Sequence, residues 1–234
     1  MQNKHFFFDM DGTVTFTRSK ITPPMKEALT ELMKITTVGI ISGSTNKQMA
    51  FQVDGLPVIQ MGQNGNHVID PDEGELWFDT ITEAEKKIIF KHCTLLRDAF
   101  SHTVPNEDDL LEDRGSQISF SIYGHHADPA VKKAFDGDFK KRTALLAKVP
   151  FLSETIEVRL GGSTTFDYFR KGHHKGHNVA RLIAHKGWDA EECLFFGDAL
   201  FPGGNDESVI GVIETVSVTD EEDCYRKVKE LLIG

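Results

Sequence analysis

The chain of 234 residues is longer than one small domain and shorter than two full ones. Hydrophobic residues make up 39% and charged residues 26%, which excludes a wholly disordered chain, and no apolar run approaches the ~18 residues of a membrane span. A formal net charge of −10 argues against a nucleic-acid surface, and three scattered cysteines without a CxxC pair argue against a disulfide framework or a thiolate zinc site. The apolar stretch at residues 6–8 is too short for a signal peptide. We therefore expect a globular protein of the cytoplasm, with neither nucleic acid nor membrane as a partner.

Residues 1–80 alternate short apolar runs with helical patterns. The run at residues 6–8 predicts a strand that ends in Asp-Met-Asp-Gly-Thr, and Thr22 with two following prolines opens a helix. The run at residues 38–41 predicts a second strand that ends in Ser-Gly-Ser. Runs that are apolar throughout are typical of strands buried on both faces, so this region predicts a parallel α/β sheet.

Residues 81–170 have a different pattern. Thr82 and Glu85 form a possible capping box at the start of a helix that runs to about residue 100, and a second helix is predicted over about residues 129–148. The strands predicted at residues 117–122, 155–160 and 164–169 alternate polar and apolar residues, and Gly161-Gly162 predicts a hairpin between the last two. This region predicts an antiparallel α+β module with one solvated face.

Residues 171–234 return to the first pattern. We predict a helix over about residues 175–185, a strand at 193–196, one or two short strands within 209–218, and a last helix at about 221–232. The expected fold class is α/β: a Rossmann-like core with a parallel sheet from residues 1–80 and 171–234, plus an inserted α+β cap domain with an antiparallel sheet from residues 81–170. The insertion points near residues 80 and 171 are expected to act as hinges.

Acidic and polar side chains follow the predicted parallel strands at their carboxyl ends, where open α/β sheets bind their ligands. Any one of these residues is more simply a turn or a helix cap, but together they occur in order at successive strand ends. The set comprises Asp9, Asp11, Ser42, Asp198, Asn205 and Asp206, with Lys175 at the start of a helix.

Carboxylates gathered at one edge would repel each other unless a cation lies among them. Oxygen ligands without Cys or His favour a hard ion, Mg²⁺. An ion of this kind beside a lysine suits phosphoryl transfer, and an unpaired aspartate there can attack phosphorus to form an aspartyl phosphate. The sequence therefore predicts a Mg²⁺-dependent phosphotransferase.

These residues resemble the four motifs of the haloacid dehalogenase superfamily. The motifs are the run from Asp9 to Thr13, Ser42, Lys175, and Gly197-Asp198 with Asn205-Asp206. The resemblance implies that Asp9 is the nucleophile and Asp11 the general acid/base. It implies that Ser42, Lys175 and the adjoining Gly43 and Ser44 hold the transferring phosphoryl group. It also implies Mg²⁺ ligands from Asp9, the Asp11 carbonyl, Asp198 and Asn205 or Asp206. The insertion after the second motif resembles the class with a large α/β cap.

A narrower resemblance, to the eukaryotic-type phosphomannomutases, covers nearly the whole chain. It rests on the run from Pro202 to Asp206, on Arg18, on Asn64-Gly65, on Arg114-Gly115, and on the segment 161–167. It implies that Arg18, Thr165 and Asp167 contact a phosphorylated sugar and that mannose 1-phosphate and mannose 6-phosphate are interconverted, as in GDP-mannose biosynthesis. It also implies a homodimer through the cap.

The cap departs from that family, which uses three cap arginines to hold a second phosphate. The first is present as Arg114, whereas the second and third positions hold His125 and Lys132. Lysine lacks the bidentate fork of arginine, and histidine is largely neutral at pH 7. The retained residues favour the mutase, and the altered cations favour a sugar-phosphate phosphatase. A non-catalytic phospho-ligand binder is a third alternative, which an Asp9→Asn variant would separate from an enzyme.

Overall fold

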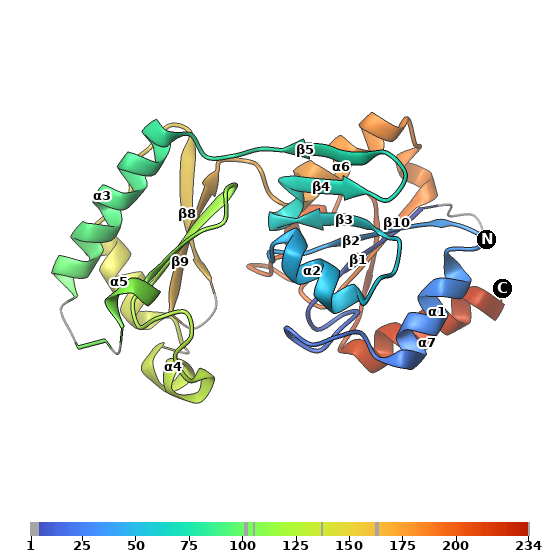
Figure 1. The fold of residues 1–234 in the computed structure, drawn as a ribbon, viewed down its shortest axis with the longest axis horizontal. Helices are drawn as coiled ribbons and strands as arrows, with labels where there is room; N and C mark the ends of the chain where they lie inside the picture. Colours follow the sequence, from blue (N-terminus) through green and yellow to red (C-terminus); the bar gives the residue numbers. More distant parts are fainter. Residues whose placement is uncertain (1–4, 101–102, 105, 137, 162–163, 234) are drawn as a thin grey trace. The chain divides into compact units, whose positions relative to one another are not determined.

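The computed structural model describes residues 5–100, 103–104, 106–136, 138–161 and 164–233 (Figure 1). The chain divides into two compact units. The first, called here the core unit, comprises Met1–Phe78 and Gly172–Gly234, and the second, the cap unit, comprises Asp79–Lys171.

The core unit is built on a seven-stranded sheet in the order β11-β10-β1-β2-β3-β4-β5. The first five strands in this order are parallel, and they are β11 (Glu214–Ser217), β10 (Cys193–Gly197), β1 (His5–Asp9), β2 (Thr37–Ile41) and β3 (Ile59–Gly62). The sheet continues in antiparallel pairing through β4 (His67–Asp70) and β5 (Gly74–Phe78), an extension that the sequence did not predict.

Helices cover both faces of this sheet. Phe6 and Phe8 of β1 pack into a hydrophobic cluster with α1 (Pro23–Leu32), α2 (Asn46–Val53) and α7 (Glu221–Ile233). Phe7 belongs to a second cluster that includes α6 (Lys175–Lys186). Successive residues of β1 thus face different helical layers, as expected for a strand buried on both faces. The α/β fold with a mostly parallel sheet is confirmed.

The helix α6 begins and ends at defined residues. His174 is the N-cap, and its Nδ1 accepts a hydrogen bond from the His177 amide at 3.2 Å. Gly187 ends the helix with a left-handed φ of 66°, a conformation in which glycine carries no Cβ penalty. These signals place Lys175 at the first residue of the helix.

The cap unit has one long helix, α3 (Glu83–Ala99), against a four-stranded antiparallel sheet. The strand order is β6 (Leu111–Asp113), β7 (Gln117–Ser121), β9 (Thr165–Arg170) and β8 (Ile156–Gly161). Ile118 and Phe120 of β7 pack in the cluster that contains α3, whereas the alternating residues of β7 carry polar side chains. The predicted α+β module with an antiparallel sheet is confirmed, and the capping box of Thr82 and Glu85 is present.

The prediction of one helix over residues 129–148 is wrong. The structure has α4 (Pro129–Asp136) and α5 (Lys140–Lys148), separated at Phe139, whose φ of 62° is left-handed. The Asp136 carboxylate accepts a hydrogen bond from the Lys141 amide at 2.8 Å and so stabilises the start of α5.

The predicted hairpin of the cap is present as the antiparallel pairing of β8 and β9, in which Gly161 lies opposite Thr165. Gly162, to which the predicted turn was assigned, lies outside the described residues. The short 3-10 helices are η1 (Gln63–Gly65), η2 (Glu107–Asp109), η3 (Ala190–Glu192) and η4 (Glu207–Val209).

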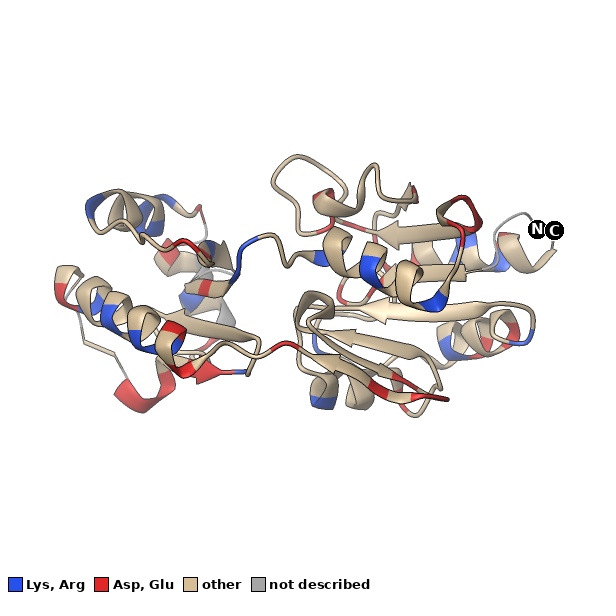
Figure 2. Cartoon of the chain, turned by 90° about the horizontal axis from the view of Figure 1, so that it is seen from above, with Lys and Arg blue, Asp and Glu red and all other residues tan. Residues whose placement is uncertain are grey.

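Charged residues of both signs are interspersed along the helices of each unit (Figure 2). Among the described residues, every helix is too short or too polar to cross a bilayer.

Candidate active site

Three carboxylates of the core unit gather at the carboxyl ends of β1 and β10. Asp9 ends β1, Asp198 follows β10, and Asp206 lies in the loop before η4. Each offers an oxygen atom, and these oxygens all lie within 4.8 Å of one another. Two of the side chains are fully buried and that of Asp198 is half-buried, so the cluster concentrates negative charge where water is scarce.

Lys175 supplies a positive charge to this cluster. Its Nζ donates to Asp206 Oδ1 at 2.7 Å and also to Asp9 Oδ1, and its side chain is 1% exposed. The contact depends on Gly176, because a Cβ there would lie 1.8 Å from the Ser208 carbonyl oxygen. Close packing of α6 on η4 therefore brings Lys175 and Asp206 together.

The buried cluster carries more negative than positive charge, and this imbalance shifts the pKa values of its members. Burial raises the pKa of Asp9 to about 7, although Lys175 opposes the shift, and Asp206 and Asp198 add to it. Burial and Asp206 also raise the pKa of Asp198. Burial alone would lower the pKa of Lys175, but Asp9 and Asp206 outweigh it and raise that pKa. Three carboxylates face one ammonium group, so a divalent cation would complete the charge balance, and an all-oxygen donor set fits Mg²⁺.

Two glycines allow the motif loops to approach the carboxylates. Gly12 has a φ of +87°, and a Cβ there would meet Asp198 Oδ2 at 2.6 Å. A Cβ at Gly197 would meet Asp206 Oδ2 at 2.4 Å. A Cβ at either position would displace a carboxylate, because the contact is under 3.0 Å, and the positive φ of Gly12 adds a backbone penalty.

Asp11 is held apart from the three-carboxylate cluster by a hydrogen-bond network of its own. Its Oδ1 accepts from the Arg18 amide at 2.8 Å and from Gln52 Nε2 at 3.0 Å. Gln52 Nε2 also donates to Thr15 Oγ1 at 3.0 Å, and the Gln52 side chain is completely buried. Sequence reasoning missed Gln52, because nothing in the sequence links it to a carboxylate 41 residues earlier. Arg18 itself is exposed, with a left-handed φ of 56°.

The loop after β2 is fixed by the turn at η1. The Asn64 amide donates to the Ser42 carbonyl at 2.7 Å, and the Gln63 amide donates to the Ser44 carbonyl at 2.8 Å. The Ser44 amide donates to Ser42 Oγ at 3.1 Å. Ser42 is buried and Gly43 is half-buried. Asn205, the remaining predicted ligand, is exposed.

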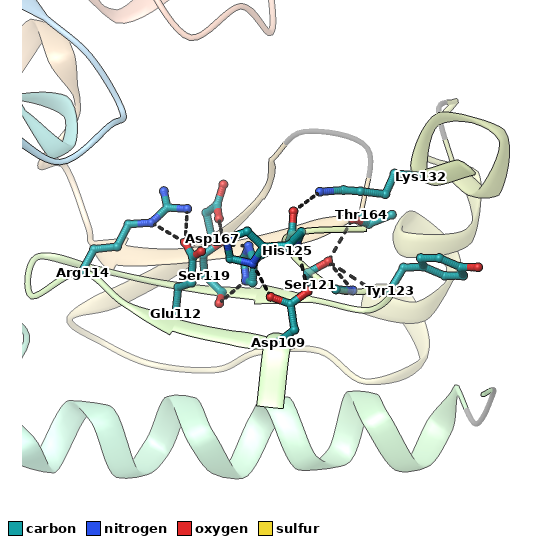
Figure 3. A network of polar contacts seen from close by, with 12 residues as sticks. Asp109, Glu112, Arg114, Ser119, Ser121, Tyr123, His125, Lys132, Thr164 and Asp167 are labelled. Atoms are coloured by element: carbon teal, nitrogen blue, oxygen red, sulfur yellow. Dashed lines mark hydrogen bonds and ion pairs between the residues drawn. The ribbon is translucent and has the colours of Figure 1, made fainter. Parts of the chain in front are cut away.

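Four of the five predicted cap residues share one polar network on a face of the antiparallel sheet (Figure 3). Glu112 Oε2 accepts from Arg114 Nε at 3.0 Å and from Nη2 at 2.6 Å, and it lies 3.8 Å from His125 Nδ1. Ser119 Oγ donates to Asp167 Oδ1 at 2.5 Å. Lys132 Nζ donates to the His125 carbonyl at 2.9 Å. The structure thus connects four of the predicted cap residues through Glu112 and Ser119, which the sequence did not point to.

Burial dominates the titration of this network. It lowers the pKa of His125, with Arg114 and Lys132 adding to the shift and Glu112 and the Ser119 carbonyl opposing it. It raises the pKa of Asp167, against the Ser119 hydroxyl and the charge of Arg114. His125 is therefore neutral at pH 7, which leaves Arg114 and Lys132 as the cations.

Thr165, the last predicted cap residue, is held through its backbone. Arg142 Nη1 donates to the Gly161 carbonyl at 2.6 Å and to the Thr165 carbonyl at 2.7 Å. Arg142 Nε donates to Asp136 Oδ2 at 2.6 Å, and both side chains are 0% exposed. Sequence reasoning missed this pair, because an arginine in a lysine-rich helix is typical of a surface position.

The chain is similar to known proteins in both sequence and fold. Residues 133–234 match the family model "Eukaryotic phosphomannomutase". The chain is 28% identical over 241 residues to a phosphomannomutase of Spinacia oleracea, covering 97% of this chain and 94% of that protein. It is 28% identical over 244 residues to a phosphomannomutase of Drosophila melanogaster, covering 96% and 94%.

Solved structures with a similar fold include a haloacid dehalogenase-like hydrolase from Bacteroides thetaiotaomicron. That structure has a TM-score of 0.66 and 14% identity, covering 98% of this chain and 99% of that one. A haloacid dehalogenase-like hydrolase from B. subtilis gives a TM-score of 0.67 and 14% identity, covering 97% and 99%. These similarities support an enzyme with the fold of the haloacid dehalogenase-like hydrolases. The sequence is similar to phosphomannomutases over nearly its whole length, in agreement with the resemblance seen in its motifs.

Proposed function

We propose that the protein transfers a phosphoryl group on a hexose phosphate and interconverts mannose 1-phosphate and mannose 6-phosphate. The observation that carries the proposal is the cluster of Asp9, Asp198, Asp206 and Lys175 in the core unit. The near full-length similarity to curated phosphomannomutases supports the choice of substrate. The core unit would be the catalytic domain, with the expected bounds 1–80 and 171–234, and residues 81–170 would be the inserted cap domain.

Asp9 is the proposed nucleophile. One of its oxygens would attack phosphorus, the bond from phosphorus to the sugar oxygen would break, and an aspartyl phosphate would form. Asp11 would protonate the leaving sugar oxygen and later take the proton from the accepting hydroxyl. Its contacts with Gln52 and with the Arg18 amide orient the carboxyl group for this role. Lys175 and Ser42, with Gly43 and Ser44, would hold the phosphoryl oxygens.

A magnesium ion is the proposed cofactor. Asp9, Asp198 and Asp206 would hold it, with the Asp11 carbonyl and Asn205 as further ligands. When bound, it would neutralise charge on the phosphoryl oxygens.

The cap residues would bind the sugar phosphate. Arg114 and Lys132 supply positive charge, and Asp167 and Thr165 offer acceptors to sugar hydroxyls. His125 belongs to the same network, and Arg18 of the core unit is a further proposed substrate contact. We also propose the cytoplasm as the compartment, which the three free and buried cysteines support, and a homodimer through the cap.

A sugar-phosphate phosphatase is the second candidate. It is favoured by one observation, the pairing of Arg114 with Glu112 beside a neutral His125, which weakens the cap as a site for a second phosphate. If the cap binds phosphate poorly, water rather than a sugar phosphate would accept the phosphoryl group from Asp9.

Phosphorus NMR of the purified protein separates these candidates. The sample contains Mg²⁺, mannose 1-phosphate and a trace of a hexose bisphosphate. Mannose 6-phosphate is the expected product, and inorganic phosphate in its place would identify a phosphatase. Turnover by the Asp9→Asn variant would contradict both. Absence of turnover by the wild-type protein, with ligand binding retained, would indicate a binder.

A further inference from the structure

The two ring nitrogens of His125 have different environments. Nε2 lies 3.1 Å from the Ser119 carbonyl oxygen, which can only accept, so Nε2 carries the proton and donates it there. In the neutral ring, Nδ1 therefore carries a lone pair, and it faces Glu112 Oε2 at 3.8 Å. Neutral His125 thus offers Glu112 no partner, whereas a proton on Nδ1 would create an ion pair between them.

The same carboxylate oxygen is already in use. Glu112 Oε2 accepts two hydrogen bonds from Arg114, one from Nε and one from Nη2. These bonds occupy one edge of the guanidinium group and offset its charge. An anion that needs this edge must therefore compete with Glu112 for Arg114.

We propose that His125 and Glu112 together control the affinity of Arg114 for a phosphate. A proton taken from solvent by His125 Nδ1 gives Glu112 a second cationic partner, and the edge of Arg114 becomes available to the anion. No covalent bond changes in this exchange. The inference rests on the proposed function only in taking the anion to be the phosphate of a sugar phosphate.

His125 acts through Glu112 and not by touching the ligand, because its side chain is only 5% exposed. It is therefore a positioning residue. The side chain of Glu112 is 34% exposed and that of Arg114 is 19% exposed, so these two have room to exchange partners. Figure 3 shows Arg114, Glu112 and His125 in this network from one side of the sheet.

The surroundings of His125 give the sign of the pH dependence. Burial and the charges of Arg114 and Lys132 hold the pKa of free His125 below its ordinary value. A bound dianion adds negative charge and raises that pKa, so binding takes up a proton and the affinity falls as pH rises. Several charged or titratable groups surround the His125 ring. They are Asp109 in η2, Glu112 in β6, Arg114 between β6 and β7, His126 next in the chain, Lys132 in α4 and Asp167 in β9.

The direct test is NMR of the His125 ring nitrogens in the ¹⁵N-labelled protein. Inorganic sulfate is the probe, since it stays a dianion while histidine titrates. We expect a proton on Nε2 in the free protein, and a higher pKa for His125 at saturating sulfate. The dissociation constant of sulfate at the cap should rise by up to about tenfold per pH unit between the two pKa values. A His125 titration that sulfate leaves unchanged would overturn the proposal.

Two variants sharpen the test, with His126→Gln as the matched control because that side chain is 79% exposed. Glu112→Gln frees Arg114 at every pH, so sulfate should bind at least about fivefold tighter near neutral pH, the effect of one unit charge at about 4 Å even in water. His125→Gln keeps a donor for the Ser119 carbonyl but takes no proton, so binding should be weak and independent of pH. In the control, the dissociation constant of sulfate should change with pH as it does in the wild-type protein.

The outcomes distinguish this proposal from the proposed function. Weaker sulfate binding by Glu112→Gln would show that Glu112 only orients Arg114. If the pH dependence of sulfate binding were unchanged in His125→Gln, the proton taken up on binding would go to another group. Either result would overturn the inference. Neither measurement involves turnover. Failure of the enzyme assay alone would therefore contradict the proposed function without affecting the proposed role of His125 and Glu112.

Discussion

The core unit and the cap unit contain the same kinds of charged groups under different constraints. In the core, Lys175 and Asp206 are 1% and 0% exposed, and glycines bring backbone against the carboxylates. In the cap, Arg114 and Glu112 remain 19% and 34% exposed. Removing the partner of a buried charge destabilises the folded state strongly, whereas a partly exposed charge can pair with another group or with water. The side chains of the core cluster are therefore held in one arrangement, whereas those of the cap network can exchange partners.

The largest effect is expected from Asp9→Asn. The amide cannot act as the nucleophile, so turnover should fall by roughly 10⁴-fold or more. The measurement is phosphorus NMR with mannose 1-phosphate, and Asp98→Asn on the exposed face of α3 is the control. Residual turnover above one per cent would show that the core cluster is not the reaction centre and would remove the distinction between the two units.

The next effect concerns a charge pair in the cap that is as deeply buried as those of the core. Arg142→Met leaves Asp136 buried without its partner, so the free energy of unfolding should fall by about 3–5 kcal/mol. Urea unfolding measures this, and the double variant Asp136→Leu with Arg142→Met should recover much of the loss. Arg97→Met, which removes a more exposed pair with Glu107, is the control and should cost under about 1 kcal/mol. Equal losses for the two single variants would contradict the account.

Gly12→Ala tests the crowding of the core cluster. A left-handed φ costs a non-glycine residue about 1 kcal/mol, and the new Cβ would also meet Asp198 Oδ2 at 2.6 Å. We expect the free energy of unfolding to fall by about 1–3 kcal/mol in total. Adding Mg²⁺ should raise the Tm of the variant less than that of the wild-type protein. Gly55→Ala is a matched control, since its φ of +82° is similar and nothing lies within 4 Å. If Gly55→Ala reduced the Mg²⁺ effect equally, the close approach to Asp198 would not matter.

The smallest effect is expected at the start of α3. Glu85→Gln weakens the capping box with Thr82 and should cost about 1 kcal/mol. Burial opposes ionisation of Glu85, but hydrogen bonds from the Thr82 amide and hydroxyl and from Arg170 lower its pKa from 4.5 to about 2. The stabilisation is therefore complete above pH 4.5 and lost as pH falls through about 2. Urea unfolding across this range should show a flatter acid limb for the variant, while Glu83→Gln, at an 82% exposed side chain of the same turn, should behave as wild type.

The core cluster was predictable because its determinants are local in sequence. Parallel strands place their carboxyl ends at one edge, so Asp9 and Asp198 were expected at the same edge once the strands were assigned, and the pairing of β1 with β10 brings them together. The start of α6 at Lys175 also followed from the local pattern. The antiparallel strands β4 and β5 are short, and no strand was predicted from the sequence at residues 67–78.

The cap network was less predictable because its determinants are long-range. Glu112 and Ser119 join the predicted cap residues through contacts between strands that only the register of the sheet defines. Arg142 and Gln52 are buried polar residues whose partners lie on other elements, and their residue types are usually found at the surface. At the break between α4 and α5, the Asp136 side chain accepts from the Lys141 amide, a contact that the helical pattern does not predict.

The central claim is that Asp9 carries the phosphoryl group. Its most direct test is to treat the protein with Mg²⁺ and a hexose bisphosphate, reduce with borohydride, and map the peptides by mass spectrometry. An aspartyl phosphate is reduced to homoserine, so homoserine is expected at position 9 in the wild-type protein and none in Asp9→Asn. Homoserine at another aspartate, or none in the wild-type protein while the sugar phosphate turns over, would contradict it.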